Sequence, residues 1–586
     1  MLLRIAQIEI RNFRGIATMD WSPEAGLNCL IGPGDSTKTT VLDAIELVLN
    51  PRSNFIGDDA DFYNHDHKLP VTITLTLVQI PEDFCTDARY GLHLRGWDSA
   101  NKAVVDEPGH GLEEALSIRV VVDPESLEGR WSIFNERLSD DADPPSLRYK
   151  DARELATTRL GPYAERHLGW GRYSVLSSLG KGESMNSQLA LASRAAREAF
   201  RTSNKDVFAA ATARAEKLGR HFSVTVRQKY AAELDVHGSV ITAGGVALHD
   251  GKLPLRTLGT GSSRLIVSAL QHDAGGSHIA LVDEIEHGLE PHRIARILKY
   301  LRSPPLDDDN KPPEGQAVSA IPQVFMTSHS PVVIRELSAG DIHAVRSFDG
   351  TTTIKSIEAE AKDPDTAQRH LRSTPEAFLA RRVLVGEGKT ECGLMRGLDA
   401  LWIVNGRDSF AYQGVVAING EGIPKALYIA QHLLDLGYEV LALLDSDRPP
   451  PSGEVRKIKD RGGKVLTWEG SCSTERRIFL DVPWSTVQRL VEYAVECDGP
   501  DRILHTINAV MPDGMTKLST LELAASYDND AFRDVLGAAA KTEGKAWFKD
   551  IGRAEHIAGL IFECLDQIKA KPFATMLAQA RQWVDV

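Results

Sequence analysis

The sequence has few cysteines, no long apolar run and no sustained heptad repeat, and each absence excludes a class of protein. The six cysteines among 586 residues show no CxxC or Cys/His spacing, which argues against a disulfide framework and a zinc site. No apolar run approaches the ~20 residues that span a bilayer. The opening MLLRIAQIEIRNF alternates as a strand does and is interrupted by arginines, unlike a signal peptide. We therefore expect a cytoplasmic protein.

Length and charge set further limits. A chain of 586 residues is too long for one hydrophobic core and predicts about three or four folding units. The net charge of −14 gives no overall attraction to nucleic acid. Because net charge does not report local patches, DNA stays open as a partner.

A glycine-rich segment near the N-terminus matches a phosphate-binding loop. Predicted strands over IAQIEIRNF and LNCLI precede IGPGDSTKTT, and an amphipathic helix follows. The pattern GxxxxGK[S/T] fits at Gly32, Lys38 and Thr39. Backbone N–H groups hold phosphates, the lysine reaches the terminal ones, and the threonine hydroxyl ligates Mg²⁺. Thr37 replaces the second glycine of the motif, and β-branched residues resist positive φ, so ATP hydrolysis stays open.

Three downstream segments complete a nucleotide-binding set in the expected order. LGTGSSR places Ser262 at a helix start, where it is suited to hold a phosphate across a dimer interface. HIALVDEIEHGLEP is an apolar strand that ends in Asp283 and Glu284, which are typical of a Mg²⁺ carboxylate and a water-polarising carboxylate. QVFMTSHSP places His329 after another strand, where it can sense the γ-phosphate.

Residues 1–350 resemble the ABC-type ATPase heads of the SMC, Rad50 and RecF kind in RNFRGI, IGPGDSTKTT, LGTGSSR, LVDE, EHGLEP and TSHS. In that family two heads enclose ATP, so the resemblance implies a homodimer. It implies that Glu284 is catalytic and that ATP with Mg²⁺ is bound by Gly32, Gly34, Lys38, Thr39, Thr40, Ser262, Asp283 and His329.

The segment between these motifs is predicted to be a compact helical insertion over 151–234, with a dimerisation role as one interpretation. No sustained heptads are present, which argues against a long coiled-coil arm. Its basic residues are either a DNA-facing patch or, as is more common, a solvated helix face. They are Arg194, Arg197, Arg201, Lys205, Arg214, Lys217 and Arg220.

The C-terminal half begins with a second βαβ series. RRVLVGEG, GVVAINGEG and YEVLALLDSD are predicted parallel strands whose carboxyl ends share one sheet edge. Glu387 and Glu391 lie one helical turn apart, and Asp445 and Asp447 follow a later strand. Crowded carboxylates repel one another unless a cation neutralises them, and all-oxygen ligation suits Mg²⁺ or Mn²⁺. A helix cap or a turn explains either motif alone, but not both together.

VGEGKTE and LLDSD, over residues 380–470, resemble the Toprim domain of topoisomerases, primases and some nucleases. An ABC-type head followed by Toprim resembles the OLD (overcoming lysogenization defect) family of nucleases, which includes the Gabija A component of phage defence. This resemblance implies a two-metal site of Glu387, Glu391, Asp445, Asp447 and Glu475. It also implies a catalytic lysine, for which Lys549 is favoured over Lys545.

The sequence therefore predicts an α/β protein: an ABC-type ATPase domain split over 1–150 and 235–370, and a Toprim nuclease domain over 378–586 with C-terminal helices. The predicted function is an ATP-regulated, metal-dependent DNA endonuclease in anti-phage defence, acting as a homodimer or larger oligomer. Whether it needs a helicase-like or other defence-system partner stays open. The alternatives are a RecF-type repair ATPase and a nucleotide sensor that recruits a partner. DNA versus RNA, the type of cut and the sign of ATP control stay open.

Overall fold

The computed structural model describes most of the chain, and the statements below concern those residues. They are 3–50, 55–137, 144–161, 167–170, 174–176, 185–203, 208–221, 229–230, 232, 246–273, 279–303, 322–361, 363–468, 470–523 and 525–585.

The chain forms two compact units, each built from segments that are far apart in the sequence. The first unit comprises Met1–Arg14, Ser22–Asn28 and Thr39–Ser328. The second comprises Gly15–Trp21, Cys29–Lys38 and His329–Val586. The predicted phosphate loop therefore belongs to the same unit as the C-terminal half.

The strands of the first unit form an antiparallel run and a parallel run. The antiparallel run has the order β6-β5-β7-β4-β1, with β8 beside β7, and the parallel run has the order β13-β12-β9. Their bounds are β1 Arg4–Phe13, β4 Val71–Val78, β5 Arg95–Asp98, β6 Ala103–Val105, β7 Glu113–Val122, β8 Gly129–Phe134, β9 Thr158–Leu160, β12 Ile279–Val282 and β13 Gln323–Thr327, with a short pair β10 His249–Asp250 and β11 Leu253–Pro254. The helices are α1 Lys38–Leu49, α2 Tyr149–Leu155, α4 Met185–Ser203, α5 Ala209–His221, α6 Thr260–Asp273 and α7 Pro291–Leu301.

The second unit contains a hairpin that bears on both candidate sites. Strands β14 (Ile342–Phe348) and β15 (Thr351–Ser356) pair antiparallel, and the two-residue turn Asp349-Gly350 has positive φ at both positions. This is the type I′ turn that an Asp-Gly pair favours. On one side β14 runs parallel to Cys29–Ile31 of β3 (Leu27–Ile31), and on the other β15 pairs with β2 (Ile16–Trp21).

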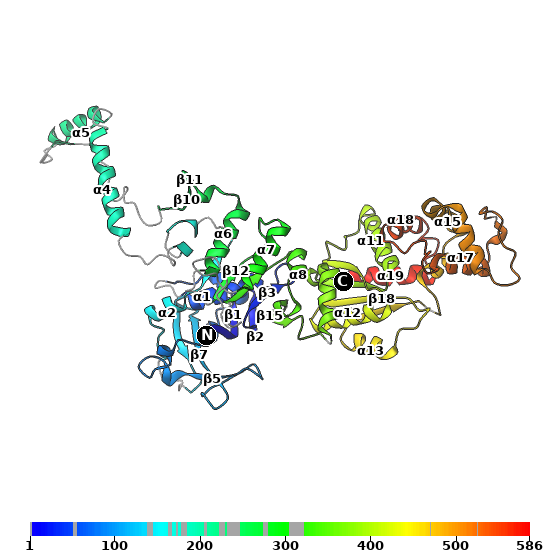
Figure 1. Cartoon of the computed structure of the whole chain (residues 1–586), viewed down its shortest axis with the longest axis horizontal. Coiled ribbons are helices and arrows are strands. Elements are labelled where there is room, and N and C mark those ends of the chain that lie inside the picture. The colour runs from blue at the N-terminus through cyan, green and yellow to red at the C-terminus, as the bar shows by residue number, and fades with distance from the viewer. Residues whose placement is uncertain are drawn as a thin grey trace. The chain divides into compact units, whose positions relative to one another are not determined.

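The predicted parallel α/β series is confirmed in the second unit. Strands β16 (Arg382–Gly386), β17 (Val415–Asn419), β18 (Glu439–Leu444) and β19 (Lys464–Thr467) are all parallel, in the order β17-β16-β18-β19. Helices α12 (Ile423–Asp435) and α13 (Ser452–Asp460) lie on one face, and α11 (Lys389–Val404) lies on the other (Figure 1). The carboxyl ends of the strands therefore share one edge, as expected.

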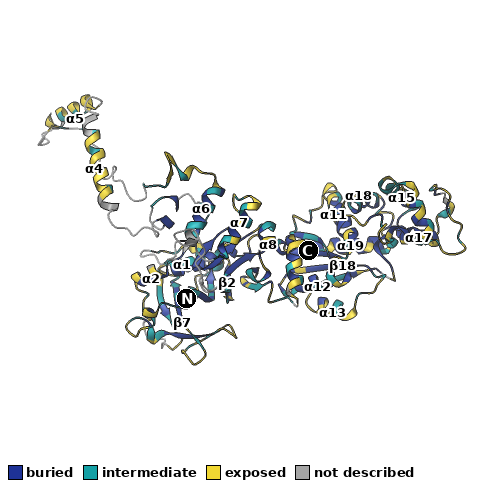
Figure 2. Ribbon diagram, in the orientation of Figure 1, coloured by how far each residue is buried: buried dark blue, intermediate teal, exposed yellow. Residues whose placement is uncertain are grey.

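A helical core covers the α11 face of this sheet. The buried cluster joins α11 and the central strands to the C-terminal helices, which Figure 2 draws in dark blue on their inner sides. Trp547 is fully buried, and Trp468 stacks on Phe573, so these tryptophans pack in the core. The remaining helices of this unit are α8 Pro331–Glu336, α9 Pro364–Ser373, α10 Pro375–Leu379, α14 Thr474–Asp481, α15 Trp484–Asp498, α16 Pro500–Val510, α17 Asp530–Lys541, α18 Ile551–Phe562 and α19 Pro572–Val584.

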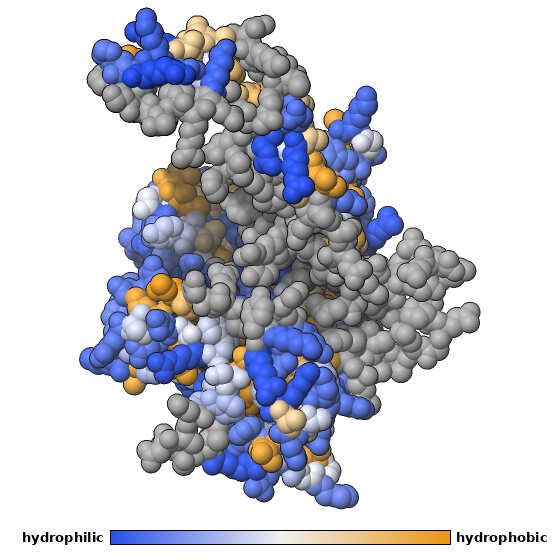
Figure 3. All heavy atoms as spheres, turned by 90° about the vertical axis from the view of Figure 1, so that its left-hand side faces the viewer, coloured by the Kyte–Doolittle hydropathy of each residue, from blue (hydrophilic) through white to orange (hydrophobic). Residues whose placement is uncertain are grey.

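Helices α4 and α5 lie within the predicted insertion 151–234, whereas β9 in the same range is a strand that pairs with β12. Helices α4 and α5 carry mainly hydrophilic side chains, with some apolar ones among them, at the top of Figure 3. Arg194, Arg214 and Arg220 are exposed, and Arg220 pairs with Glu216. Lys205 and the side chain of Arg201 lie outside the described residues. In the part of the chain that the structure describes, no helix has the length and apolarity needed to cross a bilayer.

Two glycines allow α11 and α18 to pack closely. A Cβ at Gly393 would lie 2.5 Å from the Ile551 carbonyl oxygen, and one at Gly397 would lie 2.6 Å from the Glu555 carbonyl oxygen. Larger residues would force the two helices apart. Because α11 also carries Glu391, this packing positions part of the carboxylate edge.

We predict that Gly397→Leu destabilises the second unit by about 1–3 kcal/mol or more, because overpacking strains a close helix pair. Gly559→Ala is the matched control, since a Cβ at that position of α18 meets no atom within 4 Å. Removing a helical glycine there should stabilise the protein by roughly 0.5–1 kcal/mol. Urea unfolding of both variants measures the difference, and equal stability of the two would contradict the packing argument.

Candidate functional site

The phosphate loop lies at the start of α1 and closes around Lys38. The Lys38 ammonium donates to the carbonyl oxygens of Gly32 (3.2 Å) and Pro33 (2.7 Å) and to Ser36 Oγ (3.1 Å). At Gly32, φ is +149° and a Cβ would lie 2.6 Å from the Val345 carbonyl oxygen. Glycine is therefore required at position 32, because β14 approaches the loop backbone. Gly34, in contrast, has open space around it.

Thr37 adopts the conformation that the motif usually gives to glycine. Its φ is +68°, although β-branched residues disfavour the left-handed region. Its hydroxyl donates to the Ser36 carbonyl oxygen (2.6 Å) and lies 3.1 Å from the Thr352 hydroxyl on β15. The strain predicted from the sequence is therefore present, and side-chain contacts hold the residue in place.

Asp283 follows β12, and described side chains contact both of its carboxylate oxygens. Oδ1 accepts from the hydroxyls of Thr327 (2.6 Å) and Thr39 (3.3 Å), and Oδ2 accepts from Arg159 Nη2 (2.9 Å). A threonine beside this carboxylate is the pairing expected of a Mg²⁺-nucleotide site. Thr40, the next residue, is half-buried in the first turn of α1.

Sequence reasoning missed Arg159. This arginine on β9 pairs with Glu46 (3.0 Å), with Asp43 and with Asp283. Burial alone would lower its pKa, but the charge of Asp43 and the hydrogen bonds to these carboxylates raise it. The short strand β9 gave no motif signal, and only its pairing with β12 brings Arg159 to Asp283.

Glu284 is held in a strained backbone conformation with its side chain half exposed. Its φ is +48°, and its N–H donates to Thr327 Oγ1 (2.8 Å). The carboxylate lies 3.6 Å from His287 Nδ1 and is 53% exposed. Non-glycine residues at positive φ concentrate at functional sites. An exposed carboxylate beside Asp283 is suited to orient a water molecule.

The signature segment packs on the turn that follows Glu284. A Cβ at Gly261 would lie 2.1 Å from the Gly288 carbonyl oxygen, so these two segments require glycine to meet. Ser262 Oγ accepts from Arg293 (3.2 Å) near the start of α6. Arg264 donates to the carbonyl oxygens of Asp283 (2.6 Å) and Glu284 (2.8 Å), a buried contact that the sequence did not reveal. In the second unit, His329 is exposed between β13 and α8.

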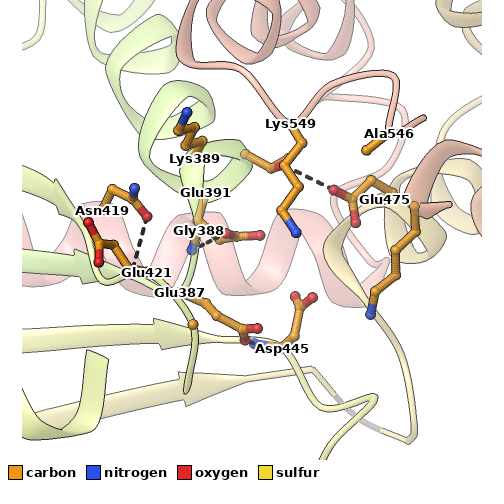
Figure 4. A pocket seen from close by; sticks show the side chains of 13 residues that line it. Glu387, Gly388, Lys389, Glu391, Asn419, Glu421, Asp445, Glu475, Ala546 and Lys549 are labelled. Carbon is orange, nitrogen blue, oxygen red and sulfur yellow. Dashed lines mark hydrogen bonds between the residues drawn. The ribbon is translucent and has the colours of Figure 1, made fainter. Parts of the chain in front are cut away.

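The carboxyl edge of the second sheet opens into a pocket of about 540 Å³. Predicted residues Glu387, Glu391, Asp445, Glu475 and Lys549 line it. The pocket thus brings together side chains that follow β16 and β18, side chains of α11 and α14, and Lys549 of the segment before α18 (Figure 4). The other lining residues are Gly388, Lys389, Thr390, Asn419, Glu421, Gly422, Lys541 and Ala546, none of which had been assigned to the site.

Backbone and hydroxyl donors fix the carboxylates in this pocket. Glu387 Oε2 accepts from the Asp445 N–H (2.8 Å), and Glu391 Oε2 accepts from the Gly388 N–H (2.7 Å). Glu475 accepts from the Thr390 hydroxyl (2.9 Å). Asp445 Oδ1 accepts from the N–H (2.9 Å) and the hydroxyl (2.7 Å) of Thr474 and from the Trp468 indole (3.2 Å). These bonds leave the carboxylates pre-oriented rather than free to turn away.

Crowding and burial raise the proton affinity of the cluster. Burial, with the charge of Glu475, raises the pKa of Glu391 to about 7. Burial and the charges of Glu391, Glu475 and Glu387 raise the pKa of Asp445 to about 8. Burial likewise raises the pKa of Glu387. Perturbed carboxylates in a cleft are typical of a functional site.

Two lysines reach the pocket, Lys541 from the end of α17 and Lys549 from the segment before α18. Figure 4 shows the Lys549 side chain extending toward the carboxylates, whereas Lys389 points away. Lys541, at the end of α17, pairs with Asp447, and this bond raises the lysine pKa against the opposing effect of burial. Asp447 and Lys545 are not among the residues that line the pocket. The structure thus adds Lys541 to the candidates.

The carboxylate oxygens of the pocket are suitable ligands for a hard divalent cation. Carboxylate oxygens are the ligands that Mg²⁺ and Mn²⁺ prefer, and a cation offsets their mutual repulsion. Within the described ranges, no group of three or more His, Cys, Asp or Glu side chains is already arranged as a metal cluster.

Comparison with known proteins gives a family for the N-terminal half. The family described as "AAA domain, putative AbiEii toxin, Type IV TA system" matches residues 27–335, more than half of the chain. The match runs from β3 into α8 and includes the phosphate loop, Asp283 and His329. No curated protein matches the chain.

Solved structures show weaker similarity. The Smc head bound to the C-winged helix domain of ScpA has a TM-score of 0.32 at 12% identity, over 60% of this chain and 97% of its own. The SMC head domain from Thermotoga maritima has a TM-score of 0.28 at 14% identity, over 60% and 98%. The recombination mediator RecF with ATPrS has a TM-score of 0.32 at 13% identity, over 60% and 98%. These scores lie below the range in which a shared fold can be stated.

We predict that Thr37→Gly tightens ATP binding roughly threefold to tenfold, because it removes about 1 kcal/mol of left-handed strain from the loop. Thr37→Ala is the control, since alanine also loses the hydroxyl but keeps the Cβ that disfavours positive φ. Titration with a fluorescent ATP analogue measures both variants. If glycine binds no more tightly than alanine, backbone strain does not limit binding.

We predict that Asp445→Asn stabilises the metal-free protein. Asparagine can still accept from Thr474 and Trp468, but it removes one of the repelling charges. A carboxyl with a raised native pKa loses stability as pH rises from its unfolded pKa near 4 to its native pKa of about 8. The gain should therefore be larger at pH 8 than at pH 5, and on the order of 2 kcal/mol.

Thermal unfolding in EDTA at the two pH values measures this effect. Added Mn²⁺ should then raise the Tm of the wild type and have a much smaller effect on the variant. Asp408→Asn is a control that removes an exposed acid outside the pocket. A wild type that is more stable than Asp445→Asn at pH 8 in EDTA would show that the cluster is not under repulsion.

Proposed function

The chain belongs to this AAA-domain family, and from that premise we propose that it is an ATP-regulated, metal-dependent DNA endonuclease of the OLD type. Its ATPase domain binds the nucleotide, and the carboxylate pocket of the second unit cuts the phosphodiester. This proposal also assigns the second α/β domain to the Toprim class. One observation carries it: acidic residues spread over Glu387 to Glu475 meet Lys549 in a single pocket.

The pocket supports phosphodiester hydrolysis better than a structural role. Buried like charges destabilise a fold unless something offsets them. Here the described hydrogen bonds orient Glu387, Glu391 and Asp445 into the pocket instead of pairing each with an arginine. A protein that needed only stability would gain from apolar residues at these positions.

The residues divide into metal ligands and cationic groups. Glu387, Glu391, Asp445, Asp447 and Glu475 would hold two divalent ions, which supply Lewis-acid stabilisation and activate water when bound. Lys549 would offset the charge that develops on the phosphate, a role for a cation beside the scissile bond. Lys541 holds Asp447 in the same region and could take over this role.

For the ATPase domain, we assign the nucleotide contacts as the sequence predicts. Gly32, Gly34, Lys38, Thr39 and Thr40 would bind the phosphates, with Asp283 supporting Mg²⁺ and Glu284 orienting water. Ser262 and His329 would act at the terminal phosphate in a homodimer. Lys38 already lies inside its loop, and Thr39 already donates to Asp283, which supports these roles. The role in antiviral defence rests on the OLD resemblance.

A RecF-type repair ATPase is the second candidate. The AAA-domain match supports it equally, because that match ends at residue 335, before the pocket. The repair-ATPase function, however, gives no reason for acids with raised pKa values to gather at the second sheet edge. The nuclease proposal therefore accounts for more of the molecule.

We predict that the wild type nicks or linearises supercoiled plasmid with Mn²⁺ or Mg²⁺, and that Asp445→Ala lowers the rate by at least about 100-fold through loss of a metal ligand. Gel analysis with and without ATP measures the rate and gives the sign of ATP control. Lys38→Ala is the matched variant in the phosphate loop. It should lose ATP binding and the effect of ATP on the cleavage rate.

Two outcomes would contradict the proposal. Equal cleavage by the wild type and Asp445→Ala would place the activity elsewhere or in a contaminant. Retained ATP binding with no cleavage under any metal condition would favour the repair ATPase.

A further inference from the structure

The β14–β15 hairpin touches the phosphate loop at one end. The Val345 carbonyl oxygen of β14 lies where a side chain at Gly32 would be, at 2.6 Å from the ideal Cβ. The Thr352 hydroxyl of β15 lies 3.1 Å from the hydroxyl of the strained Thr37. The loop and the hairpin are therefore closely packed at two points, and a change in the loop backbone at Gly32 or Thr37 alters its contact with the hairpin.

The same hairpin holds the C-terminal α/β domain through Arg346, the residue after Val345. Its guanidinium donates to the carbonyl oxygens of Arg381 (2.8 Å), Ala380 (3.2 Å) and Gly437 (3.2 Å). It also lies over the Tyr438 ring, 4.3 Å from the centroid. Burial lowers the pKa of Arg346, so the position is electrostatically unfavourable for a charged side chain. The charge-assisted hydrogen bonds from Arg346 to carbonyl oxygens nevertheless form a rigid connection between the hairpin and the C-terminal α/β domain.

The contacts of Arg346 fall at the starts of the two strands that deliver the pocket carboxylates. Ala380 and Arg381 precede β16, which ends at Gly386 before Glu387. Gly437 and Tyr438 precede β18, which ends at Leu444 before Asp445. The two strands pair in parallel register throughout, and at their far ends the Asp445 N–H donates to Glu387. Arg346 thus contacts the starts of the two strands whose far ends lead to Glu387 and Asp445.

A second cation connects the hairpin to α12. Lys355 of β15 donates to the Asp435 carbonyl oxygen at the end of this helix (2.6 Å), and a His432 ring nitrogen lies 3.0 Å from the Ile357 carbonyl oxygen. The opposite end of α12 is preceded by Gly422, its N-cap residue, which lines the pocket with Glu421. The hairpin therefore contacts β16, β18 and α12 at the ends remote from the pocket.

We propose that the β14–β15 hairpin transmits nucleotide occupancy of the phosphate loop to the carboxylate pocket, with Arg346 and Lys355 as the connecting residues. This inference rests on the proposed function, in which nucleotide controls the pocket. Phosphate binding redirects Lys38 from the Gly32 and Pro33 carbonyl oxygens, and the loop change reaches Val345 and Thr352. The strands then shift as rigid elements and set the spacing of Glu387 and Asp445, two of the residues that we assign to the metal site.

Hydrogen–deuterium exchange of the full chain tests the connection without requiring cleavage. Exchange of the wild type is measured in Mg²⁺ alone and in Mg²⁺ plus the non-hydrolysable analogue AMP-PNP. The two conditions are compared over residues 423–444. Nucleotide should change exchange there by about fivefold or more, in the range of allosteric coupling. In Arg346→Met, which keeps the aliphatic stem and removes the donors, this change should fall below about twofold while AMP-PNP still binds.

Matched variants protect the test against a simple folding defect. Arg335→Met removes an exposed arginine of the same unit, paired only with Glu376 among its described contacts, and should respond like the wild type. Lys355→Met breaks the second connection, and Thr352→Val breaks the contact at the loop end without touching the pocket side. Each of these two variants should reduce the change in exchange that AMP-PNP causes. The connection can therefore be tested even if Arg346→Met does not fold.

The outcomes separate this inference from the proposed function. Unchanged exchange over 423–444 on AMP-PNP binding, or a full response in all three hairpin variants, overturns the connection. A response that is lost in the variants, combined with no plasmid cleavage by the wild type, supports the connection and overturns the nuclease. Cleavage that nucleotide changes in the wild type and not in Arg346→Met supports both.

Discussion

Repulsion among buried carboxylates is the constraint on which the second unit depends. Asp445 lies where burial and three neighbouring acids all favour its protonated form, and its pKa rises to about 8. The surrounding structure is arranged to hold the group regardless: Thr474 and Trp468 bind one oxygen, and the Asp445 N–H holds Glu387. A core this large can tolerate one unfavourable cluster because apolar burial elsewhere outweighs it. The carboxylates at the sheet edge destabilise the fold by their mutual repulsion, and a bound cation would offset that repulsion.

The first unit shows the same arrangement on a smaller scale. Asp283 is shared by Thr39, Thr327 and Arg159, so its charge is balanced before any Mg²⁺ arrives. The guanidinium is itself held by Glu46 and Asp43, which ties the carboxylate to α1. Metal at this site must therefore compete with an existing ion pair, whereas in the C-terminal pocket it would relieve repulsion. The two sites should differ in metal affinity for this reason.

Local pattern predicted the main elements and five of the residues that line the pocket, whereas the other contacts depend on long-range pairing. The phosphate loop, the strand before Asp283 and the parallel series ending in Glu387 and Asp445 follow from periodicity within short windows. Arg159, Lys541 and Arg346 carry no such signal, because their importance arises only when β9 meets β12, α17 meets the pocket, and β14 meets the start of β16. Lys549 lines the pocket as expected, whereas Lys545 does not, a difference of one turn that the sequence could not resolve. The assignment of roles to all these residues remains a prediction.

Several positions that break local rules lie in the two candidate sites, although left-handed non-glycine residues also occur elsewhere, as at Lys102 and Leu127. Thr37 and Glu284 hold positive φ without being glycine, and burial with neighbouring acids raises the pKa of Glu391 and Asp445. All four belong to the two candidate sites, and strain of this kind persists only where surrounding contacts determine it. Thr37 is the informative case, because the hydroxyl that stabilises its backbone is shared with Thr352 on the hairpin. A change that relaxes Thr37 must alter that contact, so the strain in the phosphate loop and the conformation of the hairpin are parts of one equilibrium. Arg346 extends that equilibrium to β16 and β18, whose ends carry the unfavourable carboxylates.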